Sequence, residues 1–298
     1  MMNQIKPTWR DNLKALAYLA PMLVIIAVFS LYPIIKSLAM SFYTDYNFFT
    51  NQVNAMGFDN FKTLWQDNDF HLAVWNTIIF VIGVVPAEII ISLVIAVLLN
   101  QIKRFAGFFR TLYFMPFVTS VVAISMVWRW IYNKDAGLLN YLLGFVGVHP
   151  IDWLNDPHYA MPALIILAIW KGLGFNILLF LVALNNVDKR LYDAAMLDGA
   201  NSWQRFWHVT LPMISPMTFL VTVNAVIGSF KVFDEIFALF GGSPGPGHST
   251  LTVVYYLYQM FYEQNKYGLA AASGVVLFVM ILVVTLFQLW WSKKHVHY

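Results

Sequence analysis

Three charged residues in one short stretch of the sequence, Lys231, Asp234 and Glu235, are spaced so that they could act together. Residues three and four positions apart share one face of a helix. Charges in such apolar surroundings usually have partners or border a water-filled cavity. The spacing therefore allows two interpretations: a local ion pair that neutralises the helix, or a polar wall for a solute rich in hydroxyl groups.

Other residues in apolar stretches could extend such a wall. Lys171, Asn176 and Asn224 offer hydrogen bonds, and tryptophans such as Trp128 and Trp130 could stack on sugar rings. A structural role stays open for each, since tryptophan also gathers at membrane interfaces. Glu88 is expected to pair with another residue inside the helix bundle.

The sequence contains no pattern typical of catalysis or metal binding. It has no cysteine, and its histidines show no metal-ligand spacing. The Gly-x-x-x-x-Gly-Lys-Ser/Thr loop that cradles ATP phosphates is absent, because no Gly-Lys pair occurs. We therefore expect no enzyme, no catalytic residue, no metal site and no cofactor in this chain.

The polar segment 185–212 predicts two short helices at the membrane surface. Residues 188–198 suit a helix, and Gly199 is placed as its C-terminal stop. Asn201 or Ser202 can cap a second helix. Ala194 and its neighbour Ala195 leave a face of small side chains that another protein could approach closely, although an ordinary connecting loop is the alternative.

The composition of the chain indicates that these residues are positioned by membrane helices. Of its 298 residues, 60% are hydrophobic and 11% are charged, whereas soluble domains have about 25% charged residues. A membrane-spanning helix needs roughly 20 apolar residues, so we predict an all-α polytopic fold within a single domain, residues 1–298. Six segments are long and apolar enough to be spans: 15–35, 73–99, 111–132, 158–184, 213–239 and 268–291. The first is expected to be retained rather than cleaved as a signal peptide.

The basic residues predict the orientation. Eleven Lys and Arg residues fall in segments that an inside N-terminus would make cytoplasmic, against four in the outer segments. Positive charge is enriched on the cytoplasmic side. Both termini and the segment 185–212 are therefore expected to be cytoplasmic.

This same segment resembles the coupling-loop signature of binding-protein-dependent ABC permeases. The signature is Glu-Ala-Ala, three residues, Gly, a spacer and Leu-Pro; the matching residues are Asp193, Ala194, Ala195, Gly199, Leu211 and Pro212. Asp193 departs from the usual glutamate, which keeps the carboxylate but shortens its reach. Trp170–Phe175 resembles the fourth span of this family, and Phe230–Ile236 resembles the fifth span of its carbohydrate-uptake branch. The chain is similar to the maltose-type permease, without that protein's large inserted domain.

The resemblance implies a type I ABC importer permease in the cytoplasmic membrane of a prokaryote. Its expected partners are a second homologous permease subunit, two ATPase subunits that bind ATP and Mg, and an extracytoplasmic solute-binding protein. The coupling loop would insert into an ATPase, and the spans would move as that ATPase closes. The candidate solute path comprises Trp170, Lys171, Asn176, Asn224, Phe230, Lys231, Asp234 and Glu235.

A secondary transporter and a membrane-embedded enzyme are the alternatives to this interpretation. A secondary transporter commonly shows an internal repeat and a coupling-ion site, and neither is evident. A membrane-embedded enzyme would require a catalytic motif of the kinds missing here. For the solute, oligosaccharides are expected first, with monosaccharides, polyols and glycerol phosphate as alternatives.

Overall fold

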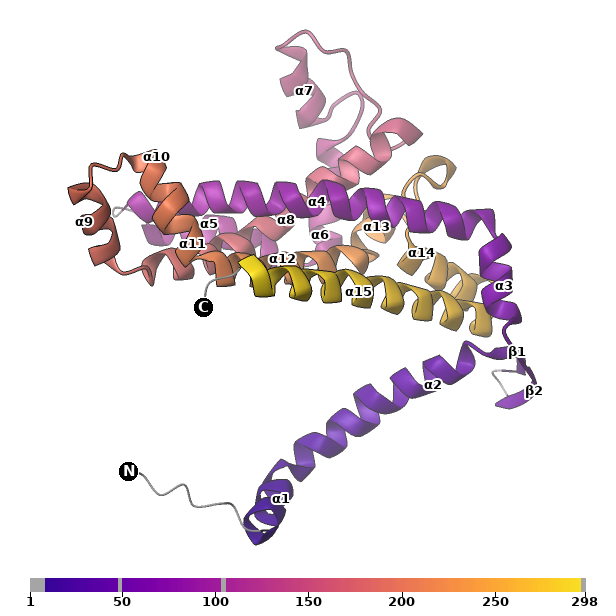
Figure 1. Cartoon of the computed structure of the whole chain (residues 1–298). Helices are drawn as coiled ribbons and strands as arrows, with labels where there is room; N and C mark the ends of the chain where they lie inside the picture. The colour runs from indigo at the N-terminus through magenta and orange to yellow at the C-terminus, as the bar shows by residue number, and fades with distance from the viewer. Residues whose placement is uncertain (1–8, 48–49, 103–105, 296–298) are drawn as a thin grey trace. The chain divides into compact units, whose positions relative to one another are not determined.

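The computed structural model describes two compact units, whose elements are labelled in Figure 1. The described residues are 9–47, 50–102 and 106–295. Parts of two basic segments used for the orientation, residues 1–8 and 103–105, lie outside them. Unit 1 comprises residues 1–66 and 259–275; unit 2 comprises residues 67–258 and 276–298.

Unit 1 contains a long apolar helical stretch followed by a two-stranded hairpin. The apolar stretch Leu13–Met40 runs over 28 residues and contains Pro21 and Pro33. The strands pair antiparallel, with Tyr43 opposite Met56 and Asn47 opposite Gln52. The elements of unit 1 are α1 (Trp9–Ile26), π-helix η1 (Ala27–Leu31), α2 (Tyr32–Met40), β1 (Tyr43–Asn47), β2 (Gln52–Met56), α3 (Asp59–Gln66), η4 (Gln259–Glu263) and the beginning of α15 (Tyr267–His295).

Unit 2 is a bundle of helices built around the two longest of them, α4 and α8. Its elements are α4 (Asn68–Gln101), α5 (Ala106–Val118), α6 (Val121–Ile131), α7 (Leu138–Gly144), α8 (Pro157–Asn185), α9 (Lys189–Leu197), α10 (Ser202–Arg205), π-helix η2 (Phe206–Thr210), α11 (Leu211–Met213), α12 (Ser215–Phe230), α13 (Asp234–Leu239), η3 (Pro246–His248), α14 (Val253–Tyr258) and the rest of α15.

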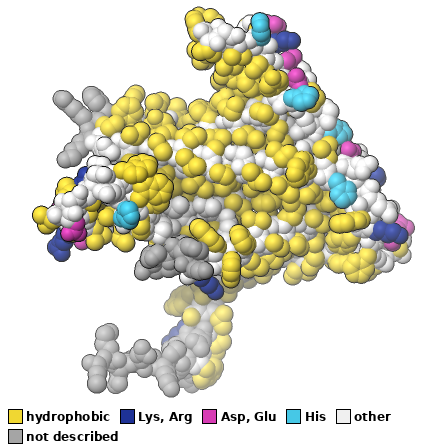
Figure 2. Space-filling view, turned by 45° about the horizontal axis from the view of Figure 1, so that its top comes forward, with side chains coloured by type: hydrophobic (Ala, Val, Ile, Leu, Met, Phe, Trp, Pro, Cys, Tyr) yellow, Lys and Arg dark blue, Asp and Glu magenta, His cyan; other side chains and the backbone are white. Residues whose placement is uncertain are grey.

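The core of unit 2 lies where α4, α8 and α12 meet. Its buried residues are Ala96, Leu99, Ile177, Phe180, Leu181, Leu184, Ile214 and Val221. In the most apolar 18-residue stretches of α4 and α8, only 28% and 33% of the residues are buried. The helices are apolar on their outward faces too, and hydrophobic side chains cover most of the surface seen in Figure 2. Such helices belong in lipid.

Four of the six predicted spans are confirmed as continuous helices. They lie within Leu13–Met40, Asn68–Gln101, Pro157–Asn185 and Tyr267–Lys293. Each covers its predicted segment and extends beyond the predicted limits by at most five residues. The all-α membrane fold is therefore confirmed.

The third predicted span, 111–132, is present as a broken pair of helices rather than as one continuous helix. The helix breaks between α5 and α6, which are bent by more than 40°. Ser120 has extended backbone angles (φ −53°, ψ 130°), and Pro116 lies one turn before the break. Proline lacks the N–H that would continue the helical ladder, so the chain can turn sharply at this point.

The fifth span, predicted over 213–239, is also discontinuous. Helix α12 ends at Phe230, and α13 begins only at Asp234. At the other end, α12 is bent by 67° from the helical segment Ser202–Met213. The charged residues near position 231 therefore lie at a helix break, where backbone groups and side chains can both face a cavity.

Candidate functional site

A cavity of about 440 Å³ opens among α4, α5, α8, α12 and α13. It falls within the range of 300–1,000 Å³ that is usual for small-molecule sites. Its wall combines aromatic rings, small residues and hydrogen-bonding groups. The lining residues are Phe80, Val84, Glu88, Phe117, Ala168, Lys171, Gly172, Phe175, Asn176, Asn224, Ala225, Gly228, Ser229, Lys231, Val232, Asp234 and Glu235.

An ion pair joins two walls of this cavity. Lys171 Nζ, on α8, donates to Glu235 Oε1, on α13, at 2.7 Å. The two side chains are 20% and 16% exposed, respectively. A charged pair so placed holds the short helix α13 against α8, and it still borders the cavity.

A second polar contact lies on the wall formed by α4 and α8. Asn176 Nδ2 donates to Glu88 Oε1 at 2.8 Å, and both side chains are buried. Gly172 lies against the same carboxylate, because a Cβ atom at this position would collide with Glu88 Oε1. The glycine thus leaves the space that the carboxylate occupies. The expected pairing of Glu88 within the bundle is confirmed.

Six of the eight residues predicted for the solute path line this cavity. The exceptions are Phe230, which is 4% exposed in the core, and Trp170, whose ring packs edge-on against Trp128 at 5.5 Å. The prediction that three charged residues share one helix face is wrong, since Lys231 follows the end of α12 and Asp234 begins α13. The observed ion pair of Glu235 is with Lys171 instead.

Several residues of this wall are not among those predicted from the sequence. Glu88, expected to pair within the bundle, also borders the cavity. The rings of Phe117 and Phe175 stack with centroids 4.9 Å apart and form an apolar side. An ionic residue in the middle of a span was a usable signal for Glu88; isolated phenylalanines in apolar helices offered none.

The polar segment 185–212 folds as two short helices, as predicted. Asp188 caps α9 by accepting from the Arg190 N–H at 2.9 Å. Asn201 and Gln204 form a reciprocal capping box at the start of α10. Figure 1 shows α9 and α10 at one end of unit 2. The chain then continues through η2 and α11, which contains Leu211 and Pro212, into α12.

Gly199 makes the turn between these helices in a left-handed conformation, with φ at +81°. Its N–H donates to the Met196 carbonyl, and the Ala200 N–H donates to the Ala195 carbonyl at 2.9 Å. This pattern is a Schellman-type helix end, for which glycine is the usual residue. The sequence-based assignment of Gly199 as the helix stop is therefore confirmed.

Several of the exposed side chains of this segment are large and apolar. Leu197 is 90% exposed and Trp203 is 69% exposed. Asp193 and Ala194 are exposed beside them, and Ala195 is half-buried. Within the described residues, no group of three His, Asp or Glu side chains could hold a metal ion.

Comparison with known proteins places these features in a family. Residues 88–295 match the family model of the binding-protein-dependent transport system inner membrane component. The chain is 36% identical to the lactose transport system permease protein LacF of Rhizobium radiobacter, over 93% of each protein. It is 37% identical to the arabinooligosaccharides transport system permease protein AraP of Bacillus subtilis, over 94% of this chain and 90% of AraP.

A solved structure has the same fold. A chain of a bacterial ABC transporter involved in the import of the acidic polysaccharide alginate superimposes with a TM-score of 0.80. The two chains are 27% identical, and the match covers 96% of each. From the family match over residues 88–295 and the similarity to LacF and AraP over nearly the whole chain, the chain belongs to the family of binding-protein-dependent transport system inner membrane components, as a permease of the carbohydrate-uptake type.

Proposed function

We propose that this chain is a membrane-spanning subunit of an ATP-driven importer for neutral oligosaccharides. The observation that carries the proposal is the cavity whose wall includes Lys171, Asn176, Asn224 and Glu235 between apolar helices. Polar groups are rare at such positions unless they meet partners or a polar solute. LacF and AraP, named for lactose and arabino-oligosaccharide transport, support this class of solute.

The wall suits a sugar because it offers both kinds of contact that a sugar needs. The amides of Asn176 and Asn224 and the charged groups can hydrogen-bond hydroxyls, while Phe117 and Phe175 supply an apolar side. The lining has no surplus of cationic groups, because it holds two basic residues, Lys171 and Lys231, against three acidic ones, Glu88, Asp234 and Glu235. This supports an uncharged solute over a sugar phosphate, which would require surplus cationic groups.

The segment around Gly199 is proposed to couple ATP hydrolysis to movement of the spans. Asp193, Ala194 and Ala195 present a carboxylate and small side chains on one short helix, and Leu197 stands almost fully exposed. Met196, Leu197 and Trp203 are each at least half exposed on this segment, and apolar side chains grouped on a surface are typical of a protein contact. Leu211 and Pro212 connect this segment to α12, so a push on α9 would reach a helix that lines the cavity.

The proposed assembly has the components that the family resemblance implies. A second homologous permease subunit would complete the path, and two ATPase subunits would bind ATP and Mg. An extracytoplasmic solute-binding protein would deliver the sugar. The chain itself would lie in the cytoplasmic membrane of a prokaryote, with α9 and α10 on the cytoplasmic side.

Uptake by the complete transporter tests this proposal. Proteoliposomes containing the chain, its partner permease, the ATPase and the binding protein are expected to take up radiolabelled lactose or arabinotriose only with ATP inside. Asn224→Ala should lower uptake while leaving assembly and binding-protein affinity unchanged. Uptake that proceeds without ATPase subunits would overturn the ATP-driven mechanism and indicate a secondary transporter. Failure with sugars but uptake of glycerol phosphate would overturn the proposed solute class.

A further inference from the structure

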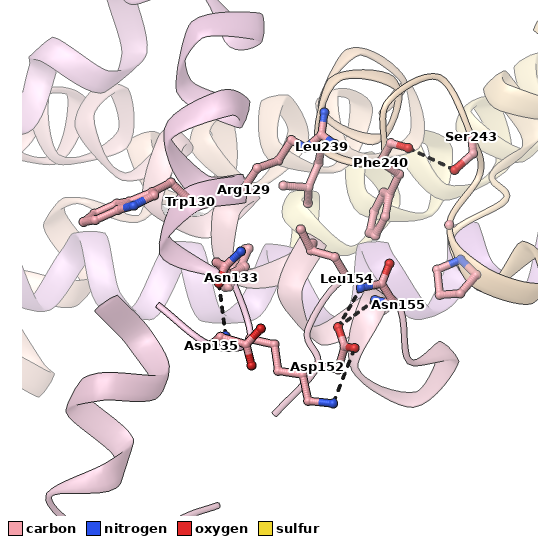
Figure 3. Close-up of a pocket in the computed structure, with 14 residues that line it drawn as sticks. Arg129, Trp130, Asn133, Asp135, Asp152, Leu154, Asn155, Leu239, Phe240 and Ser243 are labelled. Carbon is pink, nitrogen blue, oxygen red and sulfur yellow. Dashed lines mark hydrogen bonds and ion pairs between the residues drawn. The ribbon is translucent and has the colours of Figure 1, made fainter. Parts of the chain in front are cut away.

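A second and larger cavity lies in unit 2, at the other end of α8 from the coupling segment. Its volume is about 730 Å³. It is bordered by the end of α6, the loops on either side of α7, and the glycine-rich loop after α13 (Figure 3). Asn155 lies just before α8 begins, whereas α9 follows directly after α8 ends. With α9 on the cytoplasmic side, this cavity faces the outside.

One wall of this outer cavity is held in place by a buried asparagine. Asn140, which is 7% exposed, donates to the carbonyls of Lys134 and Ile151 at 2.9 and 2.8 Å. Its carbonyl oxygen accepts from Trp153 Nε1 at 2.9 Å. Tyr132 adds a bond from its hydroxyl to the Ala163 carbonyl at 2.8 Å. These contacts tie both loop segments to the bundle, so the wall is preorganised.

The opposite wall is fixed by the glycine-rich loop. Thr250 Oγ1 donates to the Pro244 carbonyl at 2.8 Å. Gly245 has φ at +77°, and a Cβ at this position would lie 2.6 Å from Thr250 Oγ1. The loop is therefore closed against a buried threonine, in a conformation that only glycine adopts without strain.

The polar side chains of the outer cavity divide into those already engaged and those that face it without a partner. Asp152 is engaged: it accepts from Asn155 Nδ2 at 2.9 Å and lies 3.9 Å from Lys134 Nζ. In contrast, no hydrogen bond or ion pair within the described part of the chain involves the side chains of Arg129 or Asp135. Asn133 uses only its carbonyl oxygen, which accepts from the Asp135 and Ala136 N–H groups.

These uncommitted groups match the chemistry of a carbohydrate. A carboxylate and a guanidinium can bind vicinal hydroxyls as acceptor and donor, and the amide of Asn133 adds two donors. Trp130, which is 60% exposed, supplies an aromatic face for the apolar side of a sugar ring. The lining holds two cations, Arg129 and Lys134, and two anions, Asp135 and Asp152. A balanced wall of this kind favours an uncharged ligand.

We propose that this outer cavity binds a sugar unit of a neutral oligosaccharide on the external side of the membrane, separately from the cavity within the spans. The inference rests on the proposed function for its solute class. It adds a second, external subsite, at which Trp130, Asp135 and Arg129 contact the sugar. The substrate would then meet the permease before it enters the span cavity.

Binding to the assembled permease–ATPase complex in lipid nanodiscs, without the solute-binding protein, tests the subsite. Lactose and arabinotriose serve as probes, and saturation-transfer NMR reports their binding. Trp130→Ala and Asp135→Ala are each expected to weaken binding about fivefold to tenfold, the effect usual for a central contact. Trp130→Phe should retain most of it, because the aromatic face remains.

Two further variants serve as controls for this test. One changes an exposed tryptophan away from the cavity, and the other changes the span cavity. Trp75 is 61% exposed but lies away from the cavity, so Trp75→Ala should bind the probes like the wild type. Trp130→Ala should weaken probe binding to the same extent in an Asn224→Ala background, in which the span cavity is already altered. If Trp130→Ala and Asp135→Ala bind as the wild type does, the subsite is wrong, even where ATP-driven uptake of sugar continues. Loss of binding in these variants supports the subsite, even if the wild-type transporter fails to import the sugar.

Discussion

Lys171 Nζ and Glu235 Oε1 lie 2.7 Å apart, although the two residues are 64 positions apart in the chain. The contact joins the middle of α8 to the first turn of α13, just past the break that ends α12. Both side chains are mostly buried, at 20% and 16% exposed. The ion pair is therefore a structural link across the cavity as well as part of its wall.

The first prediction concerns removal of one member of this pair. Glu235→Gln should lower the stability of the detergent-solubilised protein by about 1.5–3 kcal/mol, because Lys171 keeps its charge without a charged partner. The double variant Lys171→Met with Glu235→Gln should recover part of that loss. Thermal unfolding followed by circular dichroism measures both. Equal stability of the single variant and the wild type would contradict a structural link.

A second prediction tests the space that Gly172 leaves for Glu88. Gly172→Ala should displace the Glu88 carboxylate and break its contact with Asn176, because the new methyl group would collide with Glu88 Oε1. We expect a lower unfolding temperature and reduced sugar uptake. Gly228→Ala is the matched control, since Gly228 lines the same cavity and a Cβ atom there meets nothing within 4 Å.

Removal of the carboxylate should relieve this clash. Adding Glu88→Ala to Gly172→Ala should therefore cost less stability than the two single changes predict together, as expected for residues in contact. Strict additivity in the same unfolding measurement would show that Gly172 acts through some other neighbour.

The third prediction separates the proposed coupling role of Gly199 from simple backbone strain. Alanine in a left-handed conformation costs roughly 1–2 kcal/mol, and a Cβ at Gly199 meets no other atom within 4 Å. Gly147 has nearly the same φ, +80° against +81°, and equally open surroundings after α7. Gly199→Ala should reduce uptake per ATP hydrolysed, whereas Gly147→Ala should not. If uptake per ATP hydrolysed is similar in the two variants, the proposed coupling role of Gly199 is wrong.

The fourth prediction concerns alkaline pH. Tyr256 donates to Asp67 Oδ2 at 2.6 Å, and burial, followed by this bond, raises the pKa of the Tyr256 hydroxyl above its ordinary value. The neutral hydroxyl is thus favoured in the folded state. The contribution of the neutral Tyr256 hydroxyl to folding stability is complete below the usual tyrosine pKa of about 10. It is lost as the pH rises through the pKa of this hydroxyl in the folded state.

Tyr256→Phe should therefore destabilise the protein at neutral pH and flatten the loss of stability above about pH 10. Asp67 would still cap α4, because its other oxygen accepts from the Asp69 N–H at 2.8 Å. Chemical unfolding at a series of pH values measures the effect. An unchanged alkaline slope in the variant would show that other groups control it.

The fifth prediction concerns orientation, and the absence of native cysteine makes it simple to test. A cysteine at Ser202, in α10, should react with a membrane-impermeant maleimide only from the cytoplasmic side. One at Ser243, on the outer cavity, should react only from outside. Both sites are exposed. Labelling of the two from the same side would contradict the topology.

The sequence alone determined the features that depend on local pattern. In lipid, a long apolar segment satisfies its backbone N–H and C=O groups by forming a helix. Four spans could therefore be predicted close to their observed limits. The turn at Gly199 and the capping of α10 followed from residue types that favour those conformations. These features need few contacts from distant parts of the chain.

Only the tertiary structure decided which polar groups meet. The spacing of Lys231, Asp234 and Glu235 suggested one helix face, but the chain leaves the helix after Phe230 and Glu235 pairs with Lys171 instead. Such a break has no unambiguous local signal, because lipid-exposed and cavity-facing helices are similarly apolar. The external cavity is likewise built from segments about 100 residues apart, which come together only when α6, α8 and α13 pack. Local sequence preferences can fix a helix, but partners across a cavity depend on how the helices pack.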